Sequence, residues 1–137
     1  MAKTLTFAHT LAYGTPTATG RTGIGSRAYV WFKIVNPASG AASRREFALI
    51  DSGCDECFLD DGLLAGLGLT TTSSSVSAAG GGSVSVTIAT GAEIEVEGTT
   101  IGGRVLTFAS TKTSLIGRDI YLRVFDLAFT ASDWHHA

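Results

Sequence analysis

The chain has little proline, cysteine or charge. Two prolines and two cysteines occur among 137 residues, and charged residues make up 16% with a formal net charge of −2. Two cysteines cannot build the disulfide framework of a small secreted domain. A slightly acidic chain also lacks the basic field that attracts nucleic acid. We therefore expect neither a disulfide scaffold nor a nucleic-acid-binding protein.

Long apolar runs are missing as well. The longest are far shorter than the ~20 residues that span a bilayer. The opening residues, "MAKTLTFAHTLAYG", contain one lysine and no sustained apolar segment of the kind found in secretory signals. We expect no membrane partner, and a cytoplasmic location is the default.

Glycine and small β-forming residues are abundant. There are 17 glycines, and threonine, serine and valine are frequent, which favours short strands and tight turns over long helices. Hydrophobic residues make up 45%, enough for a core. The length suits one compact domain over residues 1–137, with an extension or interface segment at 1–27, a main body at 28–127 and a frayed tail at 128–137. We predict a mainly β fold, a small barrel or sandwich.

Several strands can be placed from their residues. The segment Ala28–Val35 is β-branched, aromatic and nearly continuously apolar, which predicts a strand covered on both faces. Arg45–Ile50 returns as a second strand and forms a hairpin with the first. Further strands are predicted at "SVSVTIA", at "AEIEVEG" with Ile94 and Val96 inward, at "RVLTFAS" and at "SLI".

Other segments suggest helices and loops. Leucines at helical spacing in "FLDDGLLAGLGL" predict a short helix or helical turn that Asp60 or Asp61 caps and Gly68 ends. Arg118–Phe125 is a predicted helix, and "DLAF" a last strand. The Gly/Thr-rich "GTPTATGRTGIGS" in the first 27 residues is typical of a loop.

Two motifs carry a more specific signal. "ALIDSGC" contains Asp51 at the end of an apolar strand, "SLIGRDIY" follows much later, and the glycine-rich "VSAAGGGSVSV" lies between them. This ordered set, spread over residues 28–127, resembles the retropepsin-like aspartic protease family. The resemblance implies a small closed β-barrel with a flap hairpin and one short C-terminal helix, one lobe per chain.

The resemblance also implies roles for the first motif. Asp51 would be catalytic, the Ser52 hydroxyl would stiffen the active-site loop across a dimer axis, and Gly53 would allow substrate to approach closely. Asp55 would contact substrate main chain. Because the family often has a small alanine at the position of Cys54, we expect a buried, inert thiol there.

The second motif and the hairpin receive roles in the same way. Arg118 would form a buried or part-buried ion pair with Asp55 that braces the catalytic loop. Ala79, Gly80, Gly81 and Gly82 would form the flap tip that closes over a peptide and excludes water.

The chemistry sets the expected assembly. Hydrolysis of a peptide bond without a metal needs a water made nucleophilic and a proton delivered to the amide. Two close carboxylates that share one proton can do both, one acting as base toward water and the other as acid. The chain has a single Asp-Ser-Gly. We therefore predict a homodimeric aspartic endopeptidase, with Asp51 of each chain facing its mate across a two-fold axis. The expected partners are a second copy and a peptide or protein substrate, with no metal and no other cofactor.

Competing interpretations exist for these residues. Asp51-Ser52-Gly53 alone could be a turn, and Cys54-x-x-Cys57 could be half a zinc site or a redox pair. A closed zinc site needs four ligands, however, and no second cysteine pair is present. "GIGSRA" matches a dinucleotide fingerprint, but a strand follows it instead of a helix. A remaining alternative is a module of the same fold that binds peptide or dimerises with little turnover.

Overall fold

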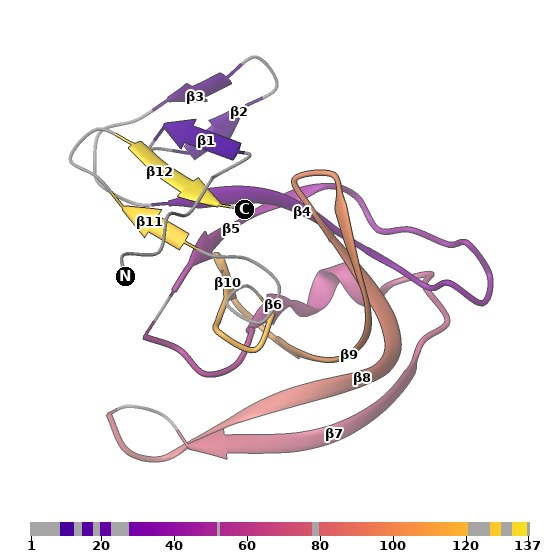
Figure 1. The fold of residues 1–137 in the computed structure, drawn as a ribbon. Coiled ribbons are helices and arrows are strands. Elements are labelled where there is room, and N and C mark those ends of the chain that lie inside the picture. The colour runs from indigo at the N-terminus through magenta and orange to yellow at the C-terminus, as the bar shows by residue number, and fades with distance from the viewer. Residues whose placement is uncertain are drawn as a thin grey trace, which may run out of the picture.

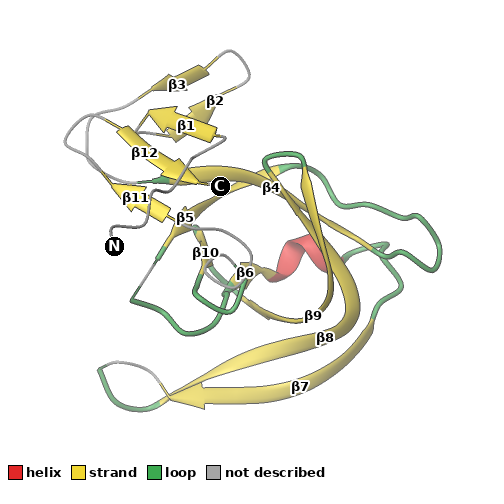
Figure 2. Ribbon diagram, in the orientation of Figure 1, coloured by secondary structure: helices red, strands yellow, loops and turns green. Residues whose placement is uncertain are grey.

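In a computed structural model of the chain, the residues described are 9–12, 15–17, 20–22, 28–51, 53–77, 80–120, 127–129 and 133–136. The fold is mainly β, with one 3₁₀ turn as its helical element among these residues (Figure 2). No helix within these ranges has the length and apolar character needed to cross a membrane.

A seven-stranded sheet forms the body of the molecule (Figure 1). Its hydrogen-bonded order is β10-β5-β4-β8-β9-β6, and β7 pairs with β8 outside this path. The strands are β4 (Tyr29–Val35), β5 (Glu46–Ile50), β6 (Leu59–Asp60), β7 (Thr70–Ser77), β8 (Ser83–Val96), β9 (Thr99–Ala109) and β10 (Ser114–Ile116). All neighbouring pairs are antiparallel except β10 with β5 and β6 with β9, which are parallel.

The two ends of this sheet meet, so the sheet is nearly closed. Phe58, just before β6, bridges Leu115 of β10, and their backbones exchange two hydrogen bonds of 2.9 and 2.7 Å. A nearly closed sheet leaves few unpaired strand edges and surrounds its inner side chains. The predicted mainly β, barrel-like fold is therefore confirmed at this level.

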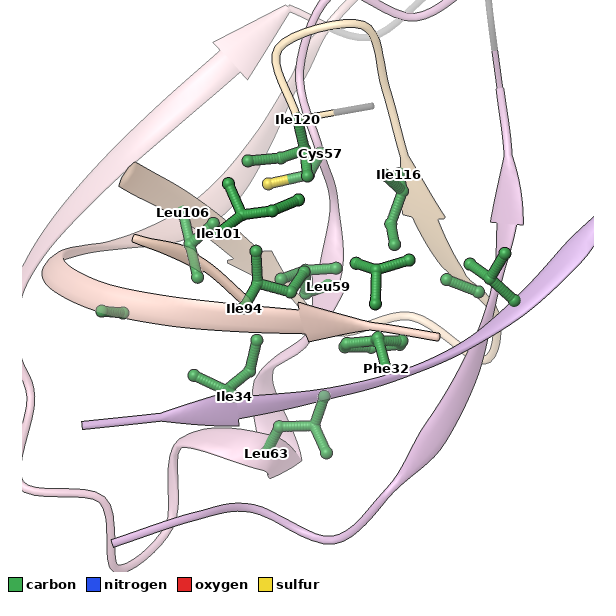
Figure 3. Close-up of a cluster of buried hydrophobic side chains, with 14 of the residues drawn as sticks. Phe32, Ile34, Cys57, Leu59, Leu63, Ile94, Ile101, Leu106, Ile116 and Ile120 are labelled. Carbon is green, nitrogen blue, oxygen red and sulfur yellow. The ribbon is translucent and has the colours of Figure 1, made fainter. Parts of the chain in front are cut away.

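The barrel interior follows from strand alternation. In β4, Val30, Phe32 and Ile34 are buried while the residues between them are half-buried. These side chains join buried residues from the other strands in one apolar cluster (Figure 3). Burying each large apolar side chain of this kind stabilises the fold by roughly 1.5–3 kcal/mol.

The expectation that both faces of β4 are covered holds in part, because the inner face is buried and the outer face is half-buried. Aromatic side chains cover part of this outer face. Trp31 and Tyr29 each pack edge-to-face against Phe47 of β5, and the Arg45 guanidinium lies 4.3 Å from the Trp31 ring centroid. These contacts explain why an outward-facing row has such an apolar sequence.

The hairpin prediction for β4 and β5 is confirmed by their antiparallel pairing.

The two segments predicted on either side of Gly91 are instead one long strand, β8. Its register against β9 shifts near Gly91, which has φ +73°. A glycine at a bulge lets a strand bend without ending. Ile94 and Val96 point inward as predicted.

The predicted leucine-rich helix is shorter than expected. It is the 3₁₀ turn η1 (Asp61–Leu64), which Asp60 caps by accepting a hydrogen bond from the Gly62 amide. It ends before Gly68 because Gly66 already has φ +76°, a conformation that terminates helices. Of the predicted C-terminal helix, Arg118–Ile120 forms a turn, and its remainder lies outside the described residues.

The terminal segments contain one strand that was predicted, since β11 (Leu127–Phe129) falls within "DLAF", and several strands that the sequence did not reveal. β2 (Thr15–Thr17) pairs with β3 (Gly20–Thr22), inside the run predicted to be loop. β12 (Asp133–His136) pairs with both β1 (His9–Ala12) and β11 (Leu127–Phe129). The predicted frayed tail is thus partly a strand, because residues near the two ends of the chain supply each other's backbone partners (Figure 1).

Candidate active site

Asp51 sits at the end of a strand that is held on both sides. β5 pairs with β4 and β10, and buries Ala48 and Ile50. The Asp51 amide then donates a 3.0 Å hydrogen bond to the Ile116 carbonyl, which continues the β5–β10 pairing by one residue. The side chain is half-buried. The backbone of Asp51 is therefore fixed by the barrel while its carboxylate stays accessible.

A tight turn follows Asp51. The Gly53 amide donates to Asp51 Oδ1 at 3.1 Å, and the Cys54 amide donates to the Asp51 carbonyl at 3.2 Å. An aspartate that accepts from the amide two residues later is a usual way to stabilise a turn. Ser52, expected to support this loop, lies outside the described residues.

Gly53 meets no steric requirement from the described residues. A Cβ added there would meet only Asp51 Oδ1, at 3.4 Å, an ordinary contact distance, and its φ is not in the left-handed region. The described residues therefore give no internal reason for glycine beside the carboxylate.

Gly117 is the opposite case, and it joins the two motifs. A Cβ at Gly117 would lie 2.4 Å from the Glu56 carbonyl oxygen and 2.7 Å from that of Cys54. The backbone of the second motif thus packs directly on the loop that follows Asp51. Two hydrogen bonds reinforce the contact, from the Arg118 amide to Cys54 O at 2.9 Å and from the Asp119 amide to Asp55 O at 3.1 Å.

The predicted ion pair between Asp55 and Arg118 is present, but the prediction that it is buried was wrong. The Asp55 carboxylate pairs with the Arg118 guanidinium, yet their side chains are 81% and 49% exposed. Exposed pairs contribute at most about 1 kcal/mol. The main-chain contacts at residue 117 and beyond, and not this pair, are what fix the loop.

The two cysteines differ from expectation. Cys54, predicted to be buried, is half-exposed, and its thiol donates to the Glu56 carbonyl at 3.0 Å. Cys57 is the buried thiol, and burial raises its pKa to about 12. The two are not joined by a disulfide, and no group of three or more potential metal ligands gathers within the described ranges.

The glycine-rich segment forms the tip of a long hairpin. β7 and β8 pair continuously from Thr70↔Thr90 to Ser77↔Ser83, and the hairpin extends from the barrel (Figure 1). Gly81 and Gly82 have φ of +90° and +78°, which favours glycine, whereas Gly80 has neither a positive φ nor a neighbour within 4 Å of an added Cβ. Ala79 lies outside the described residues.

Two surface cavities of about 380 Å³ each do not coincide with Asp51. One is lined on the outer face of the barrel by residues that include Trp31, Arg45 and Glu97. The other lies between the base of the β7–β8 hairpin and the end of β9, with Asp61 and Ser110 in its lining. Asp51 is therefore part of neither of these two cavities.

One polar cluster was not predicted from the sequence. Arg44 contacts both Glu46 and Asp60, and the pKa of Glu46 is raised, first by burial and then by the Asp60 charge. The available signal was alternation: Glu46 has the same parity in its strand as Ala48 and Ile50, which are buried.

Comparison with known proteins adds no assignment. No protein-family model matches this chain, and no curated protein matches it significantly.

Proposed function

We propose that this protein is an aspartic endopeptidase of the retropepsin-like type that acts as a homodimer. The observation that carries the proposal is the backbone packing of the Asp51–Glu56 loop on Gly117, because it ties together the two motifs that suggested this chemistry. It delivers one accessible, firmly placed carboxylate per chain.

Three further features support the proposal. A single carboxylate at a strand end can become a catalytic pair if a two-fold axis brings a second copy beside it. The absence of an internal reason for Gly53 suits a position that something outside the chain approaches closely. The β7–β8 hairpin offers an element that can cover an extended peptide, which gains main-chain hydrogen bonds as an added strand does.

The reaction would use the two Asp51 carboxyls in complementary roles. Two carboxylates about 3 Å apart cannot both ionise, so they share one proton. The ionised member takes a proton from water, whose oxygen bonds to the peptide carbonyl carbon, and the protonated member gives its proton to the carbonyl oxygen. Collapse of the tetrahedral intermediate breaks the C–N bond as the nitrogen takes a proton from one carboxyl, while a hydroxyl of the intermediate gives its proton to the other carboxylate, which restores the singly protonated pair. The titrations belong to the pair and not to either residue.

The test is Asp51→Asn with Asp61→Asn as its matched control. Asp61 is an exposed aspartate outside the loop, so the same chemical change is made away from the proposed centre. In a peptide-library digest from acidic to neutral pH, we expect Asp51→Asn to lose at least about 100-fold in cleavage rate and Asp61→Asn to keep its activity. Aspartic-protease inhibitors should block the wild type.

Two outcomes would overturn the proposal. One is full cleavage by Asp51→Asn. The other is absence of inhibitor-sensitive cleavage by the wild type at every pH, which, together with retained peptide binding, would support a peptide-binding module of the same fold.

A further inference from the structure

A cluster of three charged side chains joins the start of β5 to the end of β6. Arg44 Nη2 lies 3.1 Å from Asp60 Oδ2 and 3.6 Å from Glu46 Oε1. One guanidinium nitrogen therefore serves two carboxylates that come from different strands. The cluster is partly shielded from solvent, because the Glu46 and Asp60 side chains are 24% and 23% exposed.

The hydrogen bonds within the cluster are unevenly distributed. Asp60 Oδ1 accepts from the Gly62 amide at 3.0 Å and Oδ2 accepts from Arg44, so both of its oxygens are used. Glu46 Oε2 is buried and has no hydrogen-bond partner within the part of the chain described. A buried carboxylate oxygen without a partner is costly while it is charged.

The charges of Arg44, Glu46 and Asp60 also single out Glu46. With both acids ionised, the cluster holds two negative charges against one positive charge. Among the described residues, the groups that face Glu46 from neighbouring elements add no further cation: β4 places Phe32 opposite it, and β6 contributes Asp60. Ser114 of β10 accepts a hydrogen bond from the Asp60 amide at 2.9 Å, and Asp61, the next acid, is exposed. A proton placed on Glu46 would neutralise the excess charge and give the cluster a missing donor.

We propose that Glu46 takes up a proton and donates it in a hydrogen bond to the Asp60 carboxylate, so that Arg44, Glu46 and Asp60 form a latch that tightens the junction of β5 and β6 as the solution becomes more acidic. The latch lies at the start of the strand that ends beside Asp51, and it does not depend on whether the protein hydrolyses peptides.

The direction of the pH effect follows from Glu46. Burial and the Asp60 charge raise its pKa above the ordinary 4.5 in the folded chain. A group with a raised folded pKa binds its proton more tightly when folded, so its contribution to stability is fully present below the unfolded pKa and is lost as pH rises through the folded pKa. The folded chain therefore gains stability from this group as the pH falls from neutral.

The test compares wild type with Glu46→Gln by urea unfolding at several pH values. Glutamine has the same shape, carries no charge and can donate to Asp60 at every pH. Between about pH 7 and pH 5 we expect the unfolding equilibrium of the wild type to improve relative to Glu46→Gln by roughly threefold to tenfold. Glu56→Gln, the same change at an exposed glutamate, is the matched control.

If Glu46→Gln does not fold, a direct titration of Glu46 in the wild type still tests the proposal. The NMR signal of the Glu46 carboxyl carbon should titrate above the ordinary range of glutamate in the wild type, and closer to that range in Asp60→Asn. A Glu46 that titrates at or below the ordinary value, or stability profiles of wild type and Glu46→Gln that run parallel, would overturn the latch.

Discussion

The loop after Asp51 and the tip of the β7–β8 hairpin both rely on glycine, but for opposite reasons. At Gly117 an added Cβ would strike two backbone carbonyls of the loop. At Gly80, Gly81 and Gly82, no described residue beyond the chain neighbours lies within 4 Å of an added Cβ. One region is held by its neighbours, whereas the other is shaped by its own backbone conformation. A fixed floor and a projecting hairpin are what the proposed enzyme needs for positioning a carboxylate and covering a peptide.

Gly117→Ala should cause the largest loss of stability. If it caused none, the contrast between Gly117 and the hairpin-tip glycines would not hold. The clash involves backbone atoms that a side-chain rotation cannot move, so we expect a loss of about 3 kcal/mol in the free energy of unfolding. Urea denaturation measures this loss. Gly80→Ala is the control, since its added methyl meets only open space, and it should change stability by less than about 0.5 kcal/mol. Equal losses in the two variants would contradict the contrast.

Gly81→Ala should have an intermediate effect through backbone strain alone. Its φ of +90° disfavours a residue with a Cβ, at a cost of roughly 1–2 kcal/mol. Gly81→Asn should cost less than Gly81→Ala, because asparagine tolerates positive φ better. The same urea series measures both variants. If alanine and asparagine were equivalent here, conformation would not be the reason for glycine at the tip.

The exposed ion pair of the loop should have the smallest effect. Because Asp55 and Arg118 are largely solvent-exposed, Asp55→Asn should lower stability by less than about 1 kcal/mol, and added salt should reduce the difference. Denaturation at low and high salt measures it. A loss comparable to that of Gly117→Ala would mean that the side-chain pair, and not the backbone contact, holds the loop.

Several barrel strands could be predicted from their local residue patterns. Ile94 and Val96 on β8 carry the period of two that defines an inner face, and β4 was recognised from its nearly continuous run of apolar, β-branched and aromatic residues. Near the chain ends, β11 was predicted from "DLAF", whereas β1 and β12 were missed because they depend on pairing with each other, and such distant pairing leaves no local signal. The hairpin β2–β3 was likewise hidden in a Gly/Thr-rich run.

The candidate site was predictable in part. The motif placed Asp51 at a strand end, and Asp55 beside Arg118. It did not give the exposure of that pair, because burial depends on what covers the loop and not on the loop's own residues. The same reason applies to the cysteines: Cys54 and Cys57 are chemically alike, and only the barrel decides that Cys57 is enclosed. The Arg44–Glu46–Asp60 cluster joins residues up to 16 positions apart that meet only when β5 and β6 fold together, so no local motif predicts it.

The central claim is that one active centre needs Asp51 from two chains, and a mixing experiment tests it most directly. Wild type is mixed with Asp51→Asn at constant total protein, under conditions that allow subunits to exchange, and peptide cleavage is measured against the wild-type fraction. Mixing with Asp61→Asn serves as the control and should leave activity unchanged. If the carboxylates act as a pair across a two-fold axis, activity falls as the square of the wild-type fraction. Activity that falls only in direct proportion to that fraction would show that each chain works alone, and would contradict the account.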